Sequence, residues 1–166
     1  MINSSPGSDL PVSTEDYVAL QLLVHRYADA VVHRNAAQWA SCWAEDAQWD
    51  LGRGRKVVGK VAIVGLWNMA MGGFSAVVQM VHNGGASTTA DPDRAVGRWY
   101  IDERFLRADG QNGMMLAHYE DEYVRSSTGW LFASRFLDVH YQGPCDLSGE
   151  FHNTPEKLAE RGAADA

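Results

Sequence analysis

The chain has 166 residues, 46% of them hydrophobic and 21% charged, and a formal net charge of −7 at pH 7. This length fits one domain that can bury a sizeable core. The acidic balance argues against nucleic acid or an anionic membrane as the main partner. No apolar run reaches the roughly 18 residues that a membrane-spanning helix needs. We therefore expect a cytoplasmic protein whose two cysteines stay reduced.

The N-terminal third of the sequence predicts a flexible arm followed by two helices. Residues 1–12 are polar and lack the apolar segment of a signal peptide. Ser13 or Thr14 can cap the first helix, and Asn35 can cap a second helix over residues 36–44. One apolar stripe follows the helical spacing of the first helix, and its members are Leu20, Leu23, Val24, Tyr27 and Val31.

The remainder of the sequence predicts mostly strands. The expected elements are a strand over 46–51, a turn over 52–55, a helix over 60–71, and strands over 76–90, 94–107, 114–125 and 129–141. Helices followed by an antiparallel meander indicate an α+β fold, a cone-shaped barrel with helices packed on a curved sheet around a pocket. We assign residues 13–143 to this domain and expect residues 144–166 to form a loosely ordered tail.

The strand over 97–105 carries the most informative residue of the chain. Its residues alternate, so that Trp99, Ile101 and Phe105 share one face with Glu103. A carboxylate among large hydrophobic side chains is costly unless it is paired, hydrogen-bonded or protonated. Glu103 is therefore a candidate catalytic carboxylate.

Two further residues are candidates for acid–base chemistry beside Glu103. Tyr27 lies on the apolar stripe of the first helix and is either a core tyrosine or a donor to a substrate oxygen. His82 ends an apolar run before two glycines, a position that suits a pocket mouth. A lone histidine is more often structural, but a carboxylate on a neighbouring strand would orient it for proton transfer.

A larger set of side chains is expected to line the pocket. Five aromatic residues would suit a ring-bearing ligand, although a plain hydrophobic core would use the same residues: Trp39, Trp43, Trp67, Trp99 and Phe105. Tyr119, Asp121 and His140 are weaker candidates for the lining. The scattered histidines lack metal-ligand spacing, and the sequence has no glycine-rich phosphate loop, dinucleotide fingerprint or nucleophile elbow. We expect neither a metal nor a cofactor.

The order of elements resembles the SnoaL-like branch of the nuclear-transport-factor-2-like fold over residues 14–142. The resemblance rests on the segments 26–30, 39–47, 97–100, 119–125 and 129–130. The segment Gly97-Arg98-Trp99-Tyr100 with its acidic pair looks most like the bile-acid dehydratases, and scytalone dehydratase and hexachlorocyclohexane dehydrochlorinase look more distant. The resemblance implies catalytic roles for Tyr27, His82 and Glu103, and a homodimer or homotrimer.

The sequence departs from this family pattern at two positions. Val32 replaces an aspartate that partners the histidine in many relatives, and Val139 replaces an arginine of the bile-acid enzymes. The leading hypothesis is a cofactor-independent dehydratase of a hydrophobic cyclic substrate, steroid-like or polyketide-like. An isomerase or a cyclase in the same pocket is an alternative, and so is a non-catalytic binding or assembly module.

Overall fold

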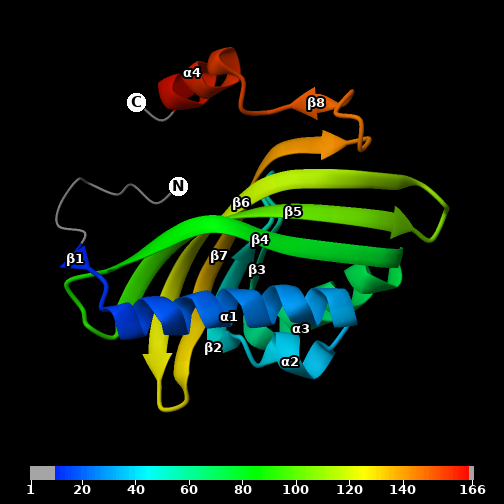
Figure 1. The fold of residues 1–166 in the computed structure, drawn as a ribbon. Helices are drawn as coiled ribbons and strands as arrows, with labels where there is room; N and C mark the ends of the chain where they lie inside the picture. Colours follow the sequence, from blue (N-terminus) through cyan, green and yellow to red (C-terminus); the bar gives the residue numbers. More distant parts are fainter. Residues whose placement is uncertain (1–9, 165–166) are drawn as a thin grey trace.

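A computed structural model describes residues 10–164, which fold around one curved sheet (Figure 1). The strands lie in the order β1 (Leu10–Pro11), β4 (Phe74–Thr88), β5 (Arg94–Arg107), β6 (Asn112–Ser126), β7 (Gly129–Gly143), β2 (Trp43–Asp50) and β3 (Lys56–Val58), and β8 (Glu150–Phe151) pairs with β7. Only the β2–β7 pair is parallel among these described strands. The sheet is therefore mixed, curved and unclosed.

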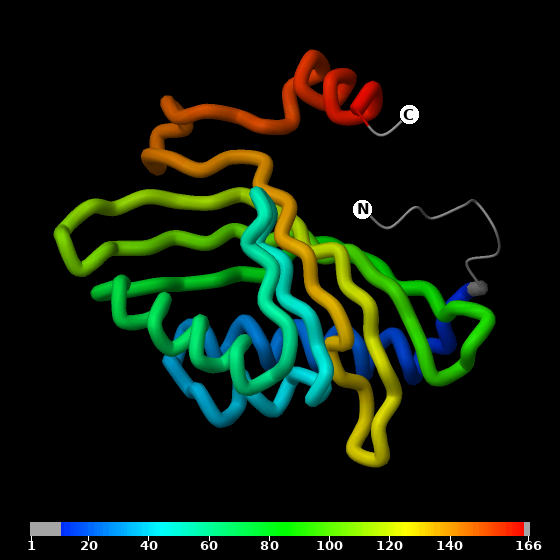
Figure 2. The backbone as a smooth tube through the Cα atoms, turned by 180° about the vertical axis from the view of Figure 1, so that it is seen from behind, coloured from blue at the N-terminus to red at the C-terminus, as the bar shows by residue number. Residues whose placement is uncertain are grey.

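The helices α1 (Thr14–His33), α2 (Ala36–Ala40) and α3 (Lys60–Gly72) lie together against one face of this sheet (Figures 1 and 2). The first helix begins at Ser13, whose hydroxyl accepts a hydrogen bond of 3.1 Å from the backbone N–H of Asp16. Its buried stripe contains Leu20, Val24 and Tyr27, as the helical spacing predicts. The predicted α+β cone with helices on a curved sheet is confirmed.

The second helix is shorter than the sequence predicts. Asn35 caps it as expected, since its side chain accepts from the backbone N–H of Gln38, but the helix ends at Ala40. Trp43 already belongs to β2, where it lies opposite Phe132 in the parallel pairing with β7. Because this pairing satisfies backbone groups over the predicted last turn, the strand replaces the helix there.

The core fills the space between the helices and the sheet. Trp39, Trp43, Trp49 and Trp67 are all at most 6% exposed, and their rings pack with centroids 4.8–6.1 Å apart. Aromatic pairs at such distances add to the free energy gained by burying their surface. The indole side chains thus bind α2, α3 and β2 into one unit.

The C-terminal tail is more ordered than the sequence predicts. Residues after Gly143 form β8, which pairs with Tyr141 and Gln142 of β7, and then α4 (Pro155–Ala164). Figure 1 shows this C-terminal extension away from α1, α2 and α3. The predicted N-terminal arm lies mostly outside the described residues, but Leu10 and Pro11 pair with Thr88 and Ser87 at the edge of the sheet.

Candidate functional site

The inner face of β5, which faces the helices, carries Glu103 among hydrophobic side chains. Trp99 and Ile101 are 1% and 2% exposed, whereas Arg98 and Arg104 are exposed on the other face, so the predicted alternation is confirmed. Glu103 is only partly buried, and so is Phe105 beyond it. The interior is therefore more open at the end of β5 that holds Glu103 than at Trp99.

Gln79 is the hydrogen-bonding partner of the Glu103 carboxylate. The two residues are directly opposite in the β4–β5 pairing, and the Gln79 Nε2 donates to Glu103 Oε2 over 2.8 Å. Burial raises the pKa of Glu103, and the Gln79 amide offsets only part of this effect. A carboxyl group in such surroundings is a stronger base than an exposed one and keeps its proton to a higher pH.

Two buried phenols lie within electrostatic reach of Glu103. Burial raises the pKa of both Tyr27 and Tyr119, and the nearby carboxylate of Glu103 raises both further. The two rings meet edge to face with centroids 5.9 Å apart. Both phenols therefore stay protonated and remain potential hydrogen-bond donors.

A buried ion pair lies behind the phenols. Arg135 and Asp121 have fully buried side chains and form two hydrogen bonds of 2.7 Å. Burial alone would lower the pKa of Arg135, but the adjacent Asp121 carboxylate raises it, so the guanidinium stays charged. The charge lies 4.3 Å from the ring centre of Tyr27 and 3.9 Å from those of Tyr119 and Phe132.

The ion pair belongs to a longer buried chain of hydrogen bonds. The Trp99 indole donates to the hydroxyl of Tyr123, and this hydroxyl donates to Asp121, both over 2.8 Å. Asp121 thus accepts from two side chains, which fixes the orientation of Arg135. The Nη1 of Arg135 still has no hydrogen-bond partner among the described residues.

Other buried polar atoms of the interior also lack partners within residues 10–164. They are the indole nitrogens of Trp39, Trp43, Trp49 and Trp67, and the Oε1 of Gln79. Because nearly all buried polar groups in proteins find a partner in protein or water, such atoms need an explanation. The interior therefore contains buried groups that could form further hydrogen bonds, and most of these groups are N–H donors.

His82 does not join Glu103 and Tyr27. Val81 packs against the core, and His82 follows it at the register shift between Val81 and Gly84, where its side chain is exposed on the face opposite to that of Val81. Within the described chain it makes no hydrogen bond or ion pair with Glu103, whose partner is Gln79. The strand β4 runs through Gly84 and Gly85 without ending. Gly84 passes so close to Trp99 that a Cβ there would lie 2.4 Å from its ring.

The predicted lining residues divide between the two faces of the sheet. All but two are buried in the interior, namely Trp39, Trp43, Trp67, Trp99, Tyr119 and Asp121. Phe105 is partly buried and packs on Phe74 with ring centres 5.5 Å apart. His140 instead lies beside His118 on the outer face of the sheet.

Sequence reasoning missed Gln79 and Arg135. Gln79 could have been found, since it lies between Val77 and Val81 on the face that carries the apolar residues of its strand. Arg135 gave no such signal. The pairings Tyr123–Phe132 and Glu122–Ser134 leave an extra residue at Ala133, and this bulge turns Arg135 inward, out of phase with Trp130 and Phe132. An arginine of the last long strand thus enters the interior although position 139 is valine.

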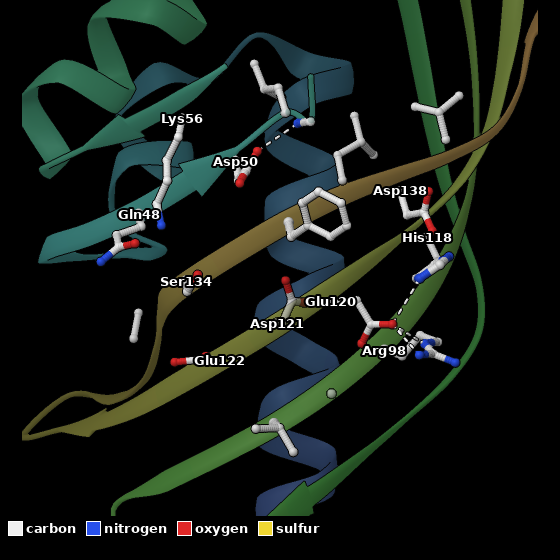
Figure 3. A pocket seen from close by; sticks show the side chains of 18 of the residues that line it. Gln48, Asp50, Lys56, Arg98, His118, Glu120, Asp121, Glu122, Ser134 and Asp138 are labelled. Carbon is white, nitrogen blue, oxygen red and sulfur yellow. Dashed lines mark hydrogen bonds and ion pairs between the residues drawn. The ribbon is translucent and has the colours of Figure 1, made fainter. Parts of the chain in front are cut away.

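A large groove lies on the opposite, outer face of the sheet. It has a volume of about 1370 Å³ and is bounded by the turn between β2 and β3, by β5, β6 and β7, and by the C-terminal extension. Figure 3 shows its labelled side chains on the side of the sheet away from α1, among them Arg98, His118 and Glu120. Neither Tyr27 nor Glu103 lines this groove.

Comparison with known proteins identifies the family. A model of the SnoaL-like domain matches residues 12–136. The chain belongs to the SnoaL-like family. No protein of curated function matches it in sequence.

Within residues 10–164, no group of three or more histidine, cysteine or acidic side chains could hold a metal ion. No helix in the same part of the chain is long and apolar enough to cross a membrane.

Solved structures share the SnoaL-like fold at low sequence identity. A candidate aromatic ring hydroxylase of Novosphingobium aromaticivorans is 24% identical with a TM-score of 0.74, over 80% of this chain and 94% of that one. The dehydrochlorinase LinA is 24% identical with a TM-score of 0.71, over 83% and 93%. Rv3472 of Mycobacterium tuberculosis, a protein of unknown function, is 20% identical with a TM-score of 0.66, over 87% and 83%. These likenesses establish the fold.

Proposed function

We propose that this protein is a cofactor-independent acid–base enzyme, a lyase or isomerase acting on a hydrophobic, ring-bearing substrate. The observation that carries the proposal is the environment of Glu103: a carboxyl group with a raised pKa, hydrogen-bonded to Gln79 and close to two protonated phenols. A carboxyl group whose pKa is raised by burial is typical of acid–base sites. Two proteins that share the fold, a hexachlorocyclohexane dehydrochlorinase and a candidate scytalone dehydratase, support the same class of chemistry.

Glu103 takes the role of proton acceptor in the proposed reaction. Its carboxylate removes a proton from a carbon next to a substrate carbonyl, and the electron pair moves toward the carbonyl oxygen. Gln79 has no proton to exchange, so it orients the carboxylate through its amide N–H. In a dehydration, the electron pair returns from the oxygen to form a carbon–carbon double bond as the neighbouring C–O bond breaks, and the proton passes to the leaving hydroxyl, which departs as water. In an isomerisation, the proton returns to another carbon of the substrate and the carbonyl group forms again.

The buried donors stabilise the charge that develops on the substrate oxygen. Tyr27 and Tyr119 supply hydroxyl groups, and the unpartnered Nη1 of Arg135 supplies a positively charged N–H. Donors that are already oriented and shielded from water stabilise such an oxyanion strongly. The apolar rings of the interior complement a ring-bearing substrate, of the steroid-like or polyketide-like class that the sequence predicts.

Histidine has no part in this proposal. His82 was expected to move the proton, but it is exposed on the outer face, and Val32 occupies the position of the family aspartate. The raised pKa of Glu103 favours proton transfer by the carboxyl group itself. The alternative of a binding module is favoured by one observation, the dense packing of Trp39, Trp43 and Trp67 in the interior.

An isotope-exchange experiment separates the enzyme from the binding module. The protein is incubated in D₂O with a panel of cyclic ketones, such as tetralones and steroid ketones, and loss of the proton next to the carbonyl is followed by NMR. We expect catalysed exchange for at least one ketone, and a loss of at least about 10²-fold in Glu103→Gln, the lower end of the contribution of a general base. The control His82→Gln should exchange at nearly the wild-type rate.

Binding is measured in parallel through the fluorescence of the buried indoles. Binding of ketones without any exchange would overturn the enzyme and support the module. Equal exchange by wild type and Glu103→Gln would overturn the role of Glu103. The expected homodimer or homotrimer stays a prediction, which sedimentation of the purified protein checks.

A further inference from the structure

A chain of four side chains crosses the outer face of the sheet, away from the proposed active site. The Nε of Arg98 donates to Glu120 over 2.6 Å, and the Nε2 of His118 lies 3.0 Å from the same carboxylate oxygen. The Nδ1 of His118 lies 2.7 Å from the Nε2 of His140 on β7. The ring of Tyr100 packs beside both histidines, with centroids 5.4 and 6.0 Å away.

Hydrogen bonding restricts how many protons this histidine pair can hold. A carboxylate only accepts hydrogen bonds, so the Nε2 of His118 carries a hydrogen that points to Glu120. One further hydrogen lies between the two rings, donated by whichever ring carries it. The pair as a whole can gain one proton and keep this contact, but if both rings were doubly protonated, two N–H groups would meet across 2.7 Å.

The C-terminal extension, defined here as residues 144–164, docks on the same part of β7. The backbone N–H of His152 donates to the carbonyl of His140 over 2.6 Å. On one side of His140, Arg161 of α4 donates to both oxygens of Asp138 over 2.9 and 3.0 Å. On the other side, Tyr141 packs on Phe151 with ring centroids 4.7 Å apart. His140 thus lies in the middle of the docking site.

The charged groups around His140 make its protonation unfavourable while the extension is docked. Burial lowers the pKa of His140 first of all, and His118, Arg161 and Arg98 lower it further, whereas only Asp138 among the named neighbours raises it. Tyr100 and Glu120 complete the titratable groups that face the pair from β5 and β6. A positive charge on His140 would therefore repel Arg161, which pairs with Asp138.

We propose that the His118–His140 pair is a proton-controlled latch that holds the C-terminal extension over the outer groove at neutral pH and releases it in mild acid. Glu120, Arg98 and Tyr100 hold His118 in place, so His140 is the ring that must turn away when both rings are charged. The charged His140 ring also repels Arg161, which weakens the ion pair of Arg161 with Asp138 and with it the docking of α4. His152 and Arg161 line the groove, so release opens one of its walls.

Proton linkage gives the direction in which pH changes the stability of docking. The docked state has a lower His140 pKa than the released state, so the released state binds more protons as pH falls. Docking is thus fully stable above the ordinary histidine pKa of about 6.5 and weakens as pH falls below it. The extension should remain docked at pH 8 and be released progressively in mild acid.

Hydrogen exchange measured by mass spectrometry on the full chain tests the latch between pH 8 and pH 5. After correction for the intrinsic pH dependence of exchange, peptides from residues 147–162 should lose protection as the pH falls, while peptides of β6 stay protected. His140→Gln keeps a side chain that can hydrogen-bond but cannot titrate, so its extension should stay protected at pH 5. The control His25→Gln, on the exposed face of α1, should behave as wild type.

A second variant makes the readout independent of His140. Asp138→Asn removes the carboxylate that pairs with Arg161, and it should weaken protection of the extension at every pH. Three results would overturn the latch: pH-independent protection in the wild type, an unchanged pH response in His140→Gln, or loss of protection in β6 at the same pH as in the extension.

Discussion

The buried Arg135–Asp121 pair offers the sharpest test of how the interior is held together. Both side chains are fully buried and share two hydrogen bonds of 2.7 Å. Arg135→Met keeps much of the side-chain volume but leaves the Asp121 carboxylate buried without its cation. Removing one partner of such a pair costs about 3–5 kcal/mol of folding free energy. For a chain of this length, that loss lowers the melting temperature by about 6–20 °C.

The double variant Arg135→Met/Asp121→Leu separates the loss of the pair from the exposure of an unpaired charge. Replacing a buried ion pair by apolar residues is often neutral or stabilising. The hydroxyl of Tyr123 would lose its acceptor, however, at a cost of about 1–3 kcal/mol. We therefore expect the double variant to be less destabilised than Arg135→Met alone.

Urea denaturation followed by circular dichroism measures both free energies of unfolding. The control is Arg94→Met, because Arg94 and Asp91 are both more than half exposed and 3.8 Å apart, so the change should cost less than about 1 kcal/mol. A loss below about 1 kcal/mol in Arg135→Met would refute the reasoning. So would a double variant whose loss equals the sum of the losses of Arg135→Met and of Asp121→Leu measured alone, since coupled partners do not add.

Three further predictions concern single side chains. Because the pKa of Glu103 is raised in the folded state, its protonated form stabilises the fold at low pH, and this contribution is lost as the pH rises through the folded-state pKa. Glu103→Gln should therefore flatten that part of the profile of unfolding free energy against pH, measured by urea denaturation. His82→Ala should reduce α-proton exchange by less than about tenfold, and a loss of 10² or more would return His82 to the active site. Trp39→Ala should cost about 3–5 kcal/mol in thermal unfolding, because Trp39 is fully buried among three other indoles.

Periodicity predicted the parts of the site that lie on regular elements. Tyr27 follows the helical repeat of α1, and Glu103 follows the alternation of β5, whose pairing with β6 has no register shift over its length. In both cases the hydrophobic residues nearby in the sequence recur at the spacing of one face, and the candidate residue falls on that face. The position of a side chain can then be read without knowledge of its distant neighbours.

Register shifts explain most of what the sequence did not predict. The extra residue at Ala133 turns Arg135 into the interior, and another irregularity, between Val81 and Gly84, includes His82. Such bulges depend on the partner strand and leave little trace in the local pattern. The early end of α2 has a similar cause, since the parallel pairing of Trp43 with Phe132 is a contact across about half of the chain.

The central claim is that Glu103 is the proton-transferring group of a largely buried site. Carboxyl-carbon NMR of the protein labelled at glutamate, with Glu103→Gln to assign the signal, follows the ionisation of this side chain directly. We expect Glu103 to titrate at a clearly higher pH than an ordinary glutamate side chain, whose pKa is about 4.3. Titration of Glu103 in the ordinary glutamate range would contradict its proposed role.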